Sequence, residues 1–422
     1  YGLFPAVSAA WVASAEPFMR NVDAISYLKL RASYGKVGSD QGGSRFMYMP
    51  ATWSTYGTYS FGVDNATGST TSYYGTPGNT GVTWETALKQ NYGVDINLFN
   101  DRLSLTAEYF FEDRSGILIT PNSTPSVIAT SLPNLNIGEV ENQGYELMLG
   151  WKDKVGNNFS YDVTLTTSFA RNKIIYMDEV ESEYSYQNMT GKSMNLQGLM
   201  YDYVRLYQYS DFSVGSDGEL VLNPDLPQPY TTVAPGDAMY ADLSGDGIVD
   251  SNDMGYTGYS TLPEYVFGLT GGFQYKNFNF RMMWSGATNV DRLMEVEYRK
   301  PFGNSSMMGL IDYFYYDTWT ETNQSGTIPR AAAETSEWNS VASTLWLRDA
   351  SYLRLKTLSM GYTFANPKIK KAIGANSIAL SLSGYNLLTF STLDFMDPES
   401  VATNSGVYPL VKIYSLGLDI NF

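Results

Sequence analysis

Apolar and polar side chains alternate at every second residue in many separate stretches, and this pattern constrains the fold more than any other feature. From Arg102 to Phe111, one face carries Leu103, Leu105, Ala107, Tyr109 and Phe111, and the other carries Arg102, Ser104, Thr106 and Glu108. A period of two fits a β-strand with one apolar face and excludes a helix. We predict eleven such strands, at residues 6–14, 25–37, 84–99, 102–113, 144–152, 158–170, 264–274, 277–287, 347–363, 377–389 and 410–422.

The connections between these strands alternate in length. Short ones cover residues 15–24, 100–101, 153–157, 275–276 and 364–376, and longer ones cover 38–83, 114–143, 171–263, 288–346 and 390–409. Tight turns at one end and long loops at the other are typical of an outer-membrane barrel. No apolar run approaches the roughly 18 residues of a membrane helix. The predicted fold class is therefore all-β, a transmembrane antiparallel β-barrel.

The composition excludes several classes of function. The chain has no histidine and no cysteine, which rules out a Ser-His-Asp triad, a thiolate or imidazole metal site and disulfides. It has 43 acidic and 27 basic residues, a net charge of -16 and no basic run longer than the Lys370–Lys371 pair, so it lacks the clustered positive charge that binds nucleic acid. Any metal would have to be bound by oxygen ligands.

The C-terminal residues resemble a barrel-assembly signal. Ser415, Gly417, Ile420 and Phe422 form a polar residue, a glycine and two outward apolar residues ending in an aromatic ring.

The first strand precedes a short turn and the last strand ends on the same side as the short turns. Bacterial barrels have an even number of strands with both ends in the periplasm, so we expect an N-terminal part of the barrel to lie outside this chain.

Seven short motifs together resemble one family. They are Gly2–Trp11, Leu28–Gly35, Thr83–Thr86, Asn142–Glu146, Asp242–Asp250, Ala350–Lys356 and Asp397–Glu399. In this order and spacing they are similar to the C-terminal half of SusC/RagA-type TonB-dependent transporters. The resemblance implies a 22-stranded barrel with a plugged lumen. Residues 1–422 would be the C-terminal portion of that one barrel domain, without its plug and its TonB-contacting segment.

The resemblance also implies a function. Such a protein imports glycans or peptides across the outer membrane of a Gram-negative, Bacteroidetes-like bacterium, takes its energy through TonB and works with a SusD-like surface lipoprotein as a lid. It is not an enzyme. Two alternatives stay open: a passive outer-membrane porin, which would have no plug, and a secreted β-rich glycan-binding adhesin, which would be soluble without detergent.

One acidic segment has the spacing of a calcium loop. Oxygen side chains stand at positions 1, 3, 5, 9 and 12 of a twelve-residue loop, with Gly247 at position 6 for the sharp turn. The predicted ligands are Asp242, Ser244, Asp246, the carbonyl of Ile248, Asp250 and Asp253. The segment departs from an EF-hand in having Asp at position 12 and no flanking helices, and a solvated acidic turn is the alternative.

The long connections are rich in aromatic residues that we expect to be exposed. The candidates for contact with a sugar or peptide substrate are Trp53, Tyr56, Tyr73, Tyr74, Tyr201, Tyr203 and Trp338. Packing between loops, docking of the lid protein and anchoring at the membrane interface are alternative roles for the same rings.

A glycosidase would need two carboxyls about 5 to 9.5 Å apart. Asp394 with Asp397 or Glu399 could supply them, but close acidic pairs are expected in so acidic a chain.

Overall fold

The computed structural model describes most of the chain in two compact units. Residues 1, 44, 51–52, 66, 129–130, 301–311, 332–336, 365–366, 369–371, 373, 394–395 and 401–409 lie outside the description, as do the side chains at 54, 56, 65, 74, 126, 297 and 313. Unit 1 comprises Tyr1–Lys152, Thr166–Glu181 and Met189–Met194, and unit 2 comprises Asp153–Leu165, Ser182–Asn188 and Asn195–Phe422.

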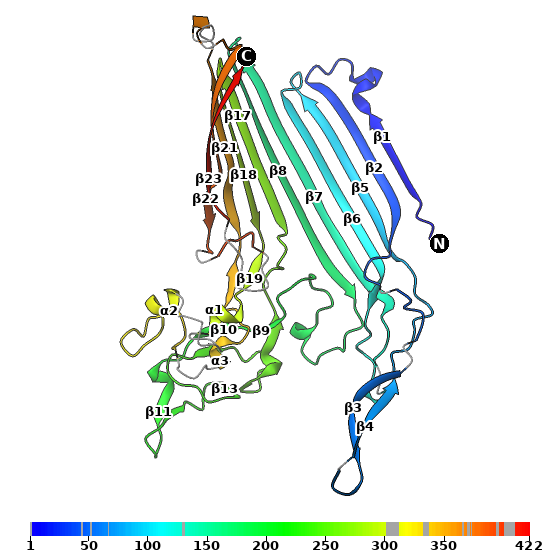
Figure 1. Ribbon diagram of the computed structural model, residues 1–422, viewed down its shortest axis with the longest axis vertical. Coiled ribbons are helices and arrows are strands. Elements are labelled where there is room, and N and C mark those ends of the chain that lie inside the picture. Colours follow the sequence, from blue (N-terminus) through cyan, green and yellow to red (C-terminus); the bar gives the residue numbers. More distant parts are fainter. Residues whose placement is uncertain are drawn as a thin grey trace. The chain divides into compact units, whose positions relative to one another are not determined.

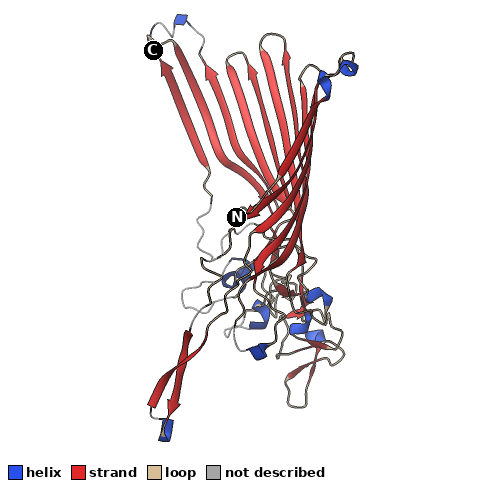
Figure 2. Cartoon of the chain, turned by 90° about the vertical axis from the view of Figure 1, so that its right-hand side faces the viewer, coloured by secondary structure: helices blue, strands red, loops and turns tan. Residues whose placement is uncertain are grey.

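All eleven predicted strands are present and form one sheet. In hydrogen-bonded order they are β1 (Ala6–Val12), β2 (Ile25–Ser39), β5 (Glu85–Leu98), β6 (Leu103–Ile119), β7 (Leu135–Val155), β8 (Phe159–Tyr176), β17 (Tyr265–Tyr275), β18 (Phe278–Thr288), β21 (Tyr352–Thr363), β22 (Ser377–Ser391) and β23 (Ile413–Asn421). Within this sheet, every strand pair whose register is described is antiparallel. This confirms the predicted fold class, and the predicted alternation of tight turns and long loops is also found (Figures 1 and 2).

The remaining elements are short and lie in the connections. The strands are β3 (Trp53–Phe61), β4 (Thr67–Tyr74), β9 (Leu199–Tyr201), β10 (Tyr203–Leu206), β11 (Phe212–Val214), β12 (Leu220–Leu222), β13 (Gln228–Pro229), β14 (Ala238–Tyr240), β15 (Ile248–Val249), β16 (Met254–Tyr256), β19 (Asp291–Leu293) and β20 (Leu347–Asp349). The α-helices are α1 (Val296–Arg299), α2 (Asp312–Tyr316) and α3 (Glu337–Ser340). No helix within the described ranges is both long and apolar enough to cross a membrane.

The strands predicted at 102–113 and 158–170 extend to Ile119 and Tyr176, and two other predictions need a larger correction. The strand expected at 144–152 runs from Leu135 to Val155, because its ladder with β6 continues past the alternating stretch to Leu135. The strand expected at 347–363 is divided into β20 and β21. The break occurs where the Ala350 N–H donates to the Val290 carbonyl at 2.9 Å and the Ser351 N–H donates to the Asp349 carboxylate at 2.8 Å.

The strand register in unit 1 keeps the two predicted faces apart. Leu105 of β6 lies opposite Ile96 of β5 and Leu149 of β7, so an apolar row crosses three strands. The next residue, Thr106, lies opposite Asp95 and Met148. Because a slip by one residue would exchange the faces, the hydrophobic pattern itself fixes this register.

The turn between β5 and β6 shows how tightly these strands are joined. Phe99, Asn100 and Asp101 all have positive φ, at 56°, 57° and 62°. Asn and Asp tolerate this region better than other non-glycine residues. The Phe99 N–H donates to the Ala24 carbonyl at 2.9 Å, and the Asn97 side-chain amide donates to the Asp101 carboxylate at 3.1 Å. The predicted two-residue connection at Asn100 and Asp101 is therefore a strained and locally hydrogen-bonded turn.

The loops of unit 2 contain a core of their own. Its buried members include Tyr201, Tyr240, Trp319, Trp338 and Trp346, between 0% and 4% exposed. Two-stranded pairs β9–β16, β10–β14 and β19–β20 form the scaffold around it. Residues of the long connections 195–260 and 289–349 thus form a packed loop domain, whereas the apolar residues of the main sheet stay largely on its exposed face.

Candidate functional site

Charged side chains of unit 1 gather on the polar face of β2, β5 and β6. Arg31 of β2 lies 2.5 Å from Glu108 of β6 and 3.4 Å from Asp95 of β5. The Asn91 side chain donates to Glu108 at 2.9 Å, and the Thr106 hydroxyl donates to Asp95 at 3.1 Å. These contacts join three strands across the face opposite the apolar rows.

A second group of charges lies toward the loop end of the same strands. Arg114 of β6 contacts Glu85 at 2.8 Å and Glu112 at 2.7 Å, and Lys89 contacts Glu112 at 3.0 Å. The basic residues are roughly half exposed, so each pair alone is worth about 1 kcal/mol or less. Arg114 is the member of this group that contacts Glu85, at the start of β5.

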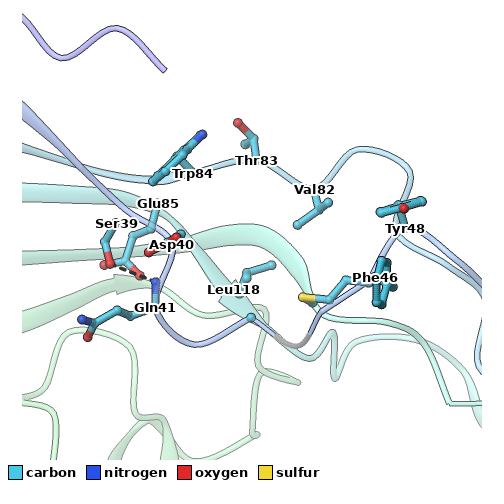
Figure 3. A pocket seen from close by; sticks show the side chains of 12 residues that line it. Ser39, Asp40, Gln41, Phe46, Tyr48, Val82, Thr83, Trp84, Glu85 and Leu118 are labelled. Atoms are coloured by element: carbon cyan, nitrogen blue, oxygen red, sulfur yellow. Dashed lines mark hydrogen bonds between the residues drawn. The ribbon is translucent and has the colours of Figure 1, made fainter. Parts of the chain in front are cut away.

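Glu85 also lines a pocket where β2 ends and the following loop begins. The pocket has a volume of about 360 Å³. Figure 3 shows its walls converging from segments far apart in sequence. They are residues 39–41, 43, 46–48, 82–85 and 118. Rings of Phe46, Tyr48 and Trp84 supply the apolar part, and Ser39, Asp40, Gln41 and Thr83 supply polar atoms.

Two amide side chains brace the loops that form the pocket walls. Asn79, which is 7% exposed, donates to the Asn134 carbonyl at 2.8 Å and accepts from the Gly81 N–H at 2.9 Å. Asn136 accepts from the Thr83 N–H at 3.0 Å and donates to the Gly116 carbonyl at 2.7 Å. These bonds satisfy loop backbone groups that would otherwise be unpaired, and they position Thr83 and Trp84.

The pocket combines ring faces with hydroxyl, amide and carboxylate oxygens. The Trp84 ring is 37% exposed, and the rings of Phe46 and Tyr48 are 64% and 53% exposed. Ring faces beside a few polar groups can pack against the apolar part of a ligand while the polar groups orient it. Phe46, Tyr48 and Trp84 are not among the substrate contacts predicted from the sequence. The only available signal was the Thr83–Thr86 motif.

The four candidate aromatic residues in residues 53–74 lie on the hairpin β3–β4, outside the pocket lining. Trp53 is 71% exposed and Tyr73 is 45% exposed, so both rings are accessible as predicted. Trp53 pairs with Tyr74 and Ser54 pairs with Tyr73, which places Trp53 and Tyr73 on opposite faces of the hairpin. The side chains of Tyr56 and Tyr74 lie outside the description. Contact of this hairpin with substrate stays a prediction.

The candidates in unit 2 are core residues, which corrects the expectation that they are exposed. Tyr201 is 4% exposed and stacks on Tyr240 with ring centroids 5.0 Å apart. Trp338 is 3% exposed and donates from its indole N–H to the Ala238 carbonyl at 2.8 Å. Tyr203 is partly buried against the same core. Burial raises the pKa of the Tyr201 phenol to about 12. Composition could not distinguish these rings from exposed ones.

The acidic segment of unit 2 folds into a compact loop. Asp242 accepts from the N–H groups of Gly245 and Gly247 at 2.6 and 2.9 Å. Asp253 is fully buried and accepts from the N–H groups of Ser244 and Asp250 at 2.9 and 2.8 Å. Gly247 has a φ of 85°, as the predicted sharp turn requires.

These carboxylates are directed at backbone N–H groups. Burial opposes ionisation of Asp242, but the N–H donors of Gly247 and Gly245 outweigh it and lower its pKa. Within the described part of the chain, no group of three or more Asp or Glu side chains is arranged to hold a metal ion. Calcium binding at Asp242, Ser244, Asp246, Ile248, Asp250 and Asp253 therefore stays a prediction.

The carboxyls considered for a glycosidase hold a loop in place. Arg354 of β21 is 1% exposed, and its Nη2 donates to both carboxylate oxygens of Asp397, at 2.9 and 2.8 Å. It also contacts Glu399 at 2.5 Å, and Glu399 accepts from Tyr352 and Lys356 at 2.8 and 2.9 Å. Both carboxylates are thus paired with cations. Asp394 lies outside the described residues.

The last strand has the predicted two faces. Leu416 and Leu418 of β23 lie opposite Leu382 and Leu380 of β22 and are 75% and 63% exposed. Gly417 lies opposite Ser381, and a Cβ there would come within 2.5 Å of the Ser381 hydroxyl oxygen. The role of Ser415, Gly417, Ile420 and Phe422 in barrel assembly stays a prediction.

Comparisons with known proteins agree on one family. The model described as "TonB dependent receptor-like, beta-barrel" matches residues 1–387. The chain is 27% identical over 441 residues to "TonB-dependent receptor P26" of Formosa agariphila, covering 100% of this chain and 42% of that protein. It is 25% identical over 444 residues to "TonB-dependent receptor SusC" of Bacteroides thetaiotaomicron, covering 100% of this chain and 40% of that protein.

A solved structure shares the fold. "Structure of the RagAB peptide transporter" superposes with a TM-score of 0.74 at 18% identity and covers 99% of this chain and 43% of that chain. The chain thus spans about two-fifths of the length of the relatives it matches.

Proposed function

The chain belongs to the family of TonB-dependent receptor-like β-barrels, and from this premise we propose that it forms part of an outer-membrane importer of glycans or peptides. The importer would take its energy through TonB and work with a SusD-like surface lipoprotein in a Gram-negative bacterium. The observation that carries the proposal is the eleven-stranded sheet with tight turns at one end and long loops at the other. Sequence matches to receptors of Formosa and Bacteroides support it.

Cargo would meet the loop end of the sheet first. The pocket of Phe46, Tyr48 and Trp84 lies at that end of β2, with an ionic network on the polar face below it. We assign the pocket as a contact site for cargo during uptake. Rings would pack on the apolar faces of a sugar or on peptide side chains, and Asp40, Gln41 and Thr83 would orient polar groups.

Uptake by the native bacterium tests the proposal. The full-length gene is deleted and restored, and entry of a labelled oligosaccharide mixture and a labelled tryptic peptide mixture is followed. We expect the deletion to abolish uptake of one mixture, and a strain without TonB to show the same loss. Uptake that persists without TonB would favour the passive porin instead. If the deletion leaves uptake of both mixtures unchanged, the import function is refuted.

Single substitutions locate the cargo contacts. Trp84→Ala removes a ring from the pocket, and a lost ring contact of about 1 kcal/mol predicts a roughly five-fold rise in the uptake KM. Trp53→Ala on the β3–β4 hairpin tests the alternative position. Tyr414→Ala, on an exposed ring of β23, is the control for a general effect on the sheet. Equal KM values for all three variants and the wild type would exclude the pocket as a contact site for cargo.

For the loop Asp242–Asp253 we propose calcium binding as a structural support. The proposal is based on the spacing of Asp242, Asp246, Asp250 and Asp253 around Gly247. Binding would require Asp242 and Asp253 to exchange their N–H donors for the ion. Calorimetric titration of chelator-treated full-length protein should show one site, lost in Asp246→Ala. No heat of binding in the wild type would exclude calcium here.

A further inference from the structure

Two arginines face each other in the two-stranded ladder β19–β20. The register pairs Asp291 with Asp349, Arg292 with Arg348 and Leu293 with Leu347. Like charges directly opposite each other destabilise a pair of strands. The charge pattern of this ladder is therefore unfavourable by itself.

The two aspartates of the ladder do not neutralise the arginines. They occupy alternate positions and so lie on the opposite face of the strands. Asp291 accepts from the Tyr259 N–H at 2.6 Å, and Asp349 accepts from the Ser351 N–H at 2.8 Å. Burial, together with the nearby Asp349 carboxylate, raises the pKa of Asp291.

Arg292 stands between two buried apolar pairs. By the two-residue period, Val290 and Met294 share its side of the strand, and each is 3% exposed. Their partners Ala350 and Trp346, joined through backbone hydrogen bonds of 2.9 and 3.0 Å, are fully buried. Arg292 itself is half-buried. Its guanidinium thus loses much of its water without gaining polar neighbours along the strand.

No carboxylate compensates for this lost hydration among the residues that the structure describes. The buried Nε of Arg292 has no hydrogen-bond partner there. Burial lowers the pKa of Arg292, and no nearby acid opposes the shift. Arg348 opposite donates to the Leu345 carbonyl. A desolvated guanidinium without a counter-charge is costly.

Six other arginines of the sheet and loops differ from Arg292 in having a carboxylate close by. Arg31, Arg114, Arg205, Arg281, Arg330 and Arg354 each lie within 4 Å of a carboxylate. The chain has 43 acidic residues for 27 basic ones, so carboxylates are in excess. Because Arg292 has no carboxylate partner among the described residues of so acidic a chain, its half-buried guanidinium is open to an anion from outside the chain.

We propose that Arg292, with Arg348 opposite, binds an anionic oxygen group of the cargo, a carboxylate or a sulfate ester. The planar guanidinium presents paired N–H donors that match such groups. This assignment deepens the proposed function, on which it rests for the identity of the ligand as cargo. Anion binding itself can be measured independently of transport.

The test uses the full-length protein in detergent and follows amide hydrogen exchange across residues 289–294. Sodium sulfate and sodium acetate are titrated separately at constant ionic strength. Exchange should slow by about threefold when the anion is at about twice its dissociation constant. Slowing by acetate alone identifies a carboxylate, and slowing by sulfate alone identifies a sulfate ester.

Variants make the test specific. Arg292→Gln should abolish the slowing of exchange. Arg292→Lys keeps the positive charge but lacks the paired N–H donors of the guanidinium, so it should weaken the slowing. Arg281→Gln removes an exposed arginine and should respond as the wild type does. The proposal is overturned if neither anion slows exchange in the wild type, or if Arg292→Gln responds equally.

It is also overturned if Arg292→Gln is unprotected before any anion is added, because Arg292 would then be a structural residue paired elsewhere in the protein. If the anions bind but the labelled mixtures are not imported, the transport proposal fails and anion binding stands.

Discussion

Removal of Arg354 should release the loop that carries Asp397 and Glu399. The guanidinium is 1% exposed and makes three close contacts with the two carboxylates, which are themselves 15% and 23% exposed. Removing one partner of a buried ion pair costs about 3 to 5 kcal/mol, because the other charge remains uncompensated. Since these carboxylates keep some contact with water and Lys356 remains near Glu399, we expect the lower limit, about 3 kcal/mol.

Hydrogen exchange measures this effect locally. A cost of about 3 kcal/mol predicts a roughly 100-fold rise in loop opening, seen as faster exchange of the amides at residues 396–400 in Arg354→Gln. The backbone amides of Glu399 and Ser400 are hydrogen-bonded to Asp397 at 2.9 and 3.0 Å and so report on the docked loop. The protein should be full-length, with barrel assembly checked by its shift on unheated gels.

Two further variants show whether charge is the cause. Arg281→Gln breaks an exposed pair with Asp162, whose side chains are 58% and 40% exposed, and should cost about 1 kcal/mol or less. Neutralising both acids in the Arg354→Gln background should restore part of the protection, because no uncompensated carboxylate remains. Equal exchange in Arg354→Gln and Arg281→Gln, or no recovery on neutralisation, would refute the reasoning.

Three other predictions concern the loop domain and the last strand. The hydrogen bond from Arg205 lowers the pKa of Asp211. This pair therefore stabilises the loop domain above the unfolded pKa of about 4, and its contribution is lost as pH falls through the lower folded pKa. The urea midpoints of wild type and Arg205→Gln should converge in that acid range, and midpoints that stay equally far apart would contradict the prediction. Gly236→Ala should destabilise the same domain by roughly 1 to 3 kcal/mol, because Gly236 has a φ of 88° and a Cβ would come within 2.3 Å of the Trp319 ring. An unchanged urea midpoint would show that the Trp319 ring moves away freely. Phe422→Ser should lower the amount of assembled protein in outer-membrane fractions without lowering synthesis, and normal assembly would remove Phe422 from the signal.

The sequence by itself determined the strands, their faces and the family. A period of two is a local property, so Leu103 to Phe111 identify an apolar face before any neighbour is known. The same pattern fixes the register, since Leu105 must lie beside Ile96 and Leu149 to keep apolar rows together. The order of the motifs was enough to identify a TonB-dependent receptor barrel, and the family match confirms it.

Tertiary structure alone decided which loop residues are buried and which meet. Tyr201 and Trp338 have the same local composition as exposed loop aromatics, and only the packing of distant segments buries them. The pocket joins residues 39–48 with 82–85 and 118, which no local pattern relates. Arg292 faces Arg348 because of a register set across a long connection. These features depend on contacts between residues far apart in the chain, and a local pattern carries no information about which of those contacts form.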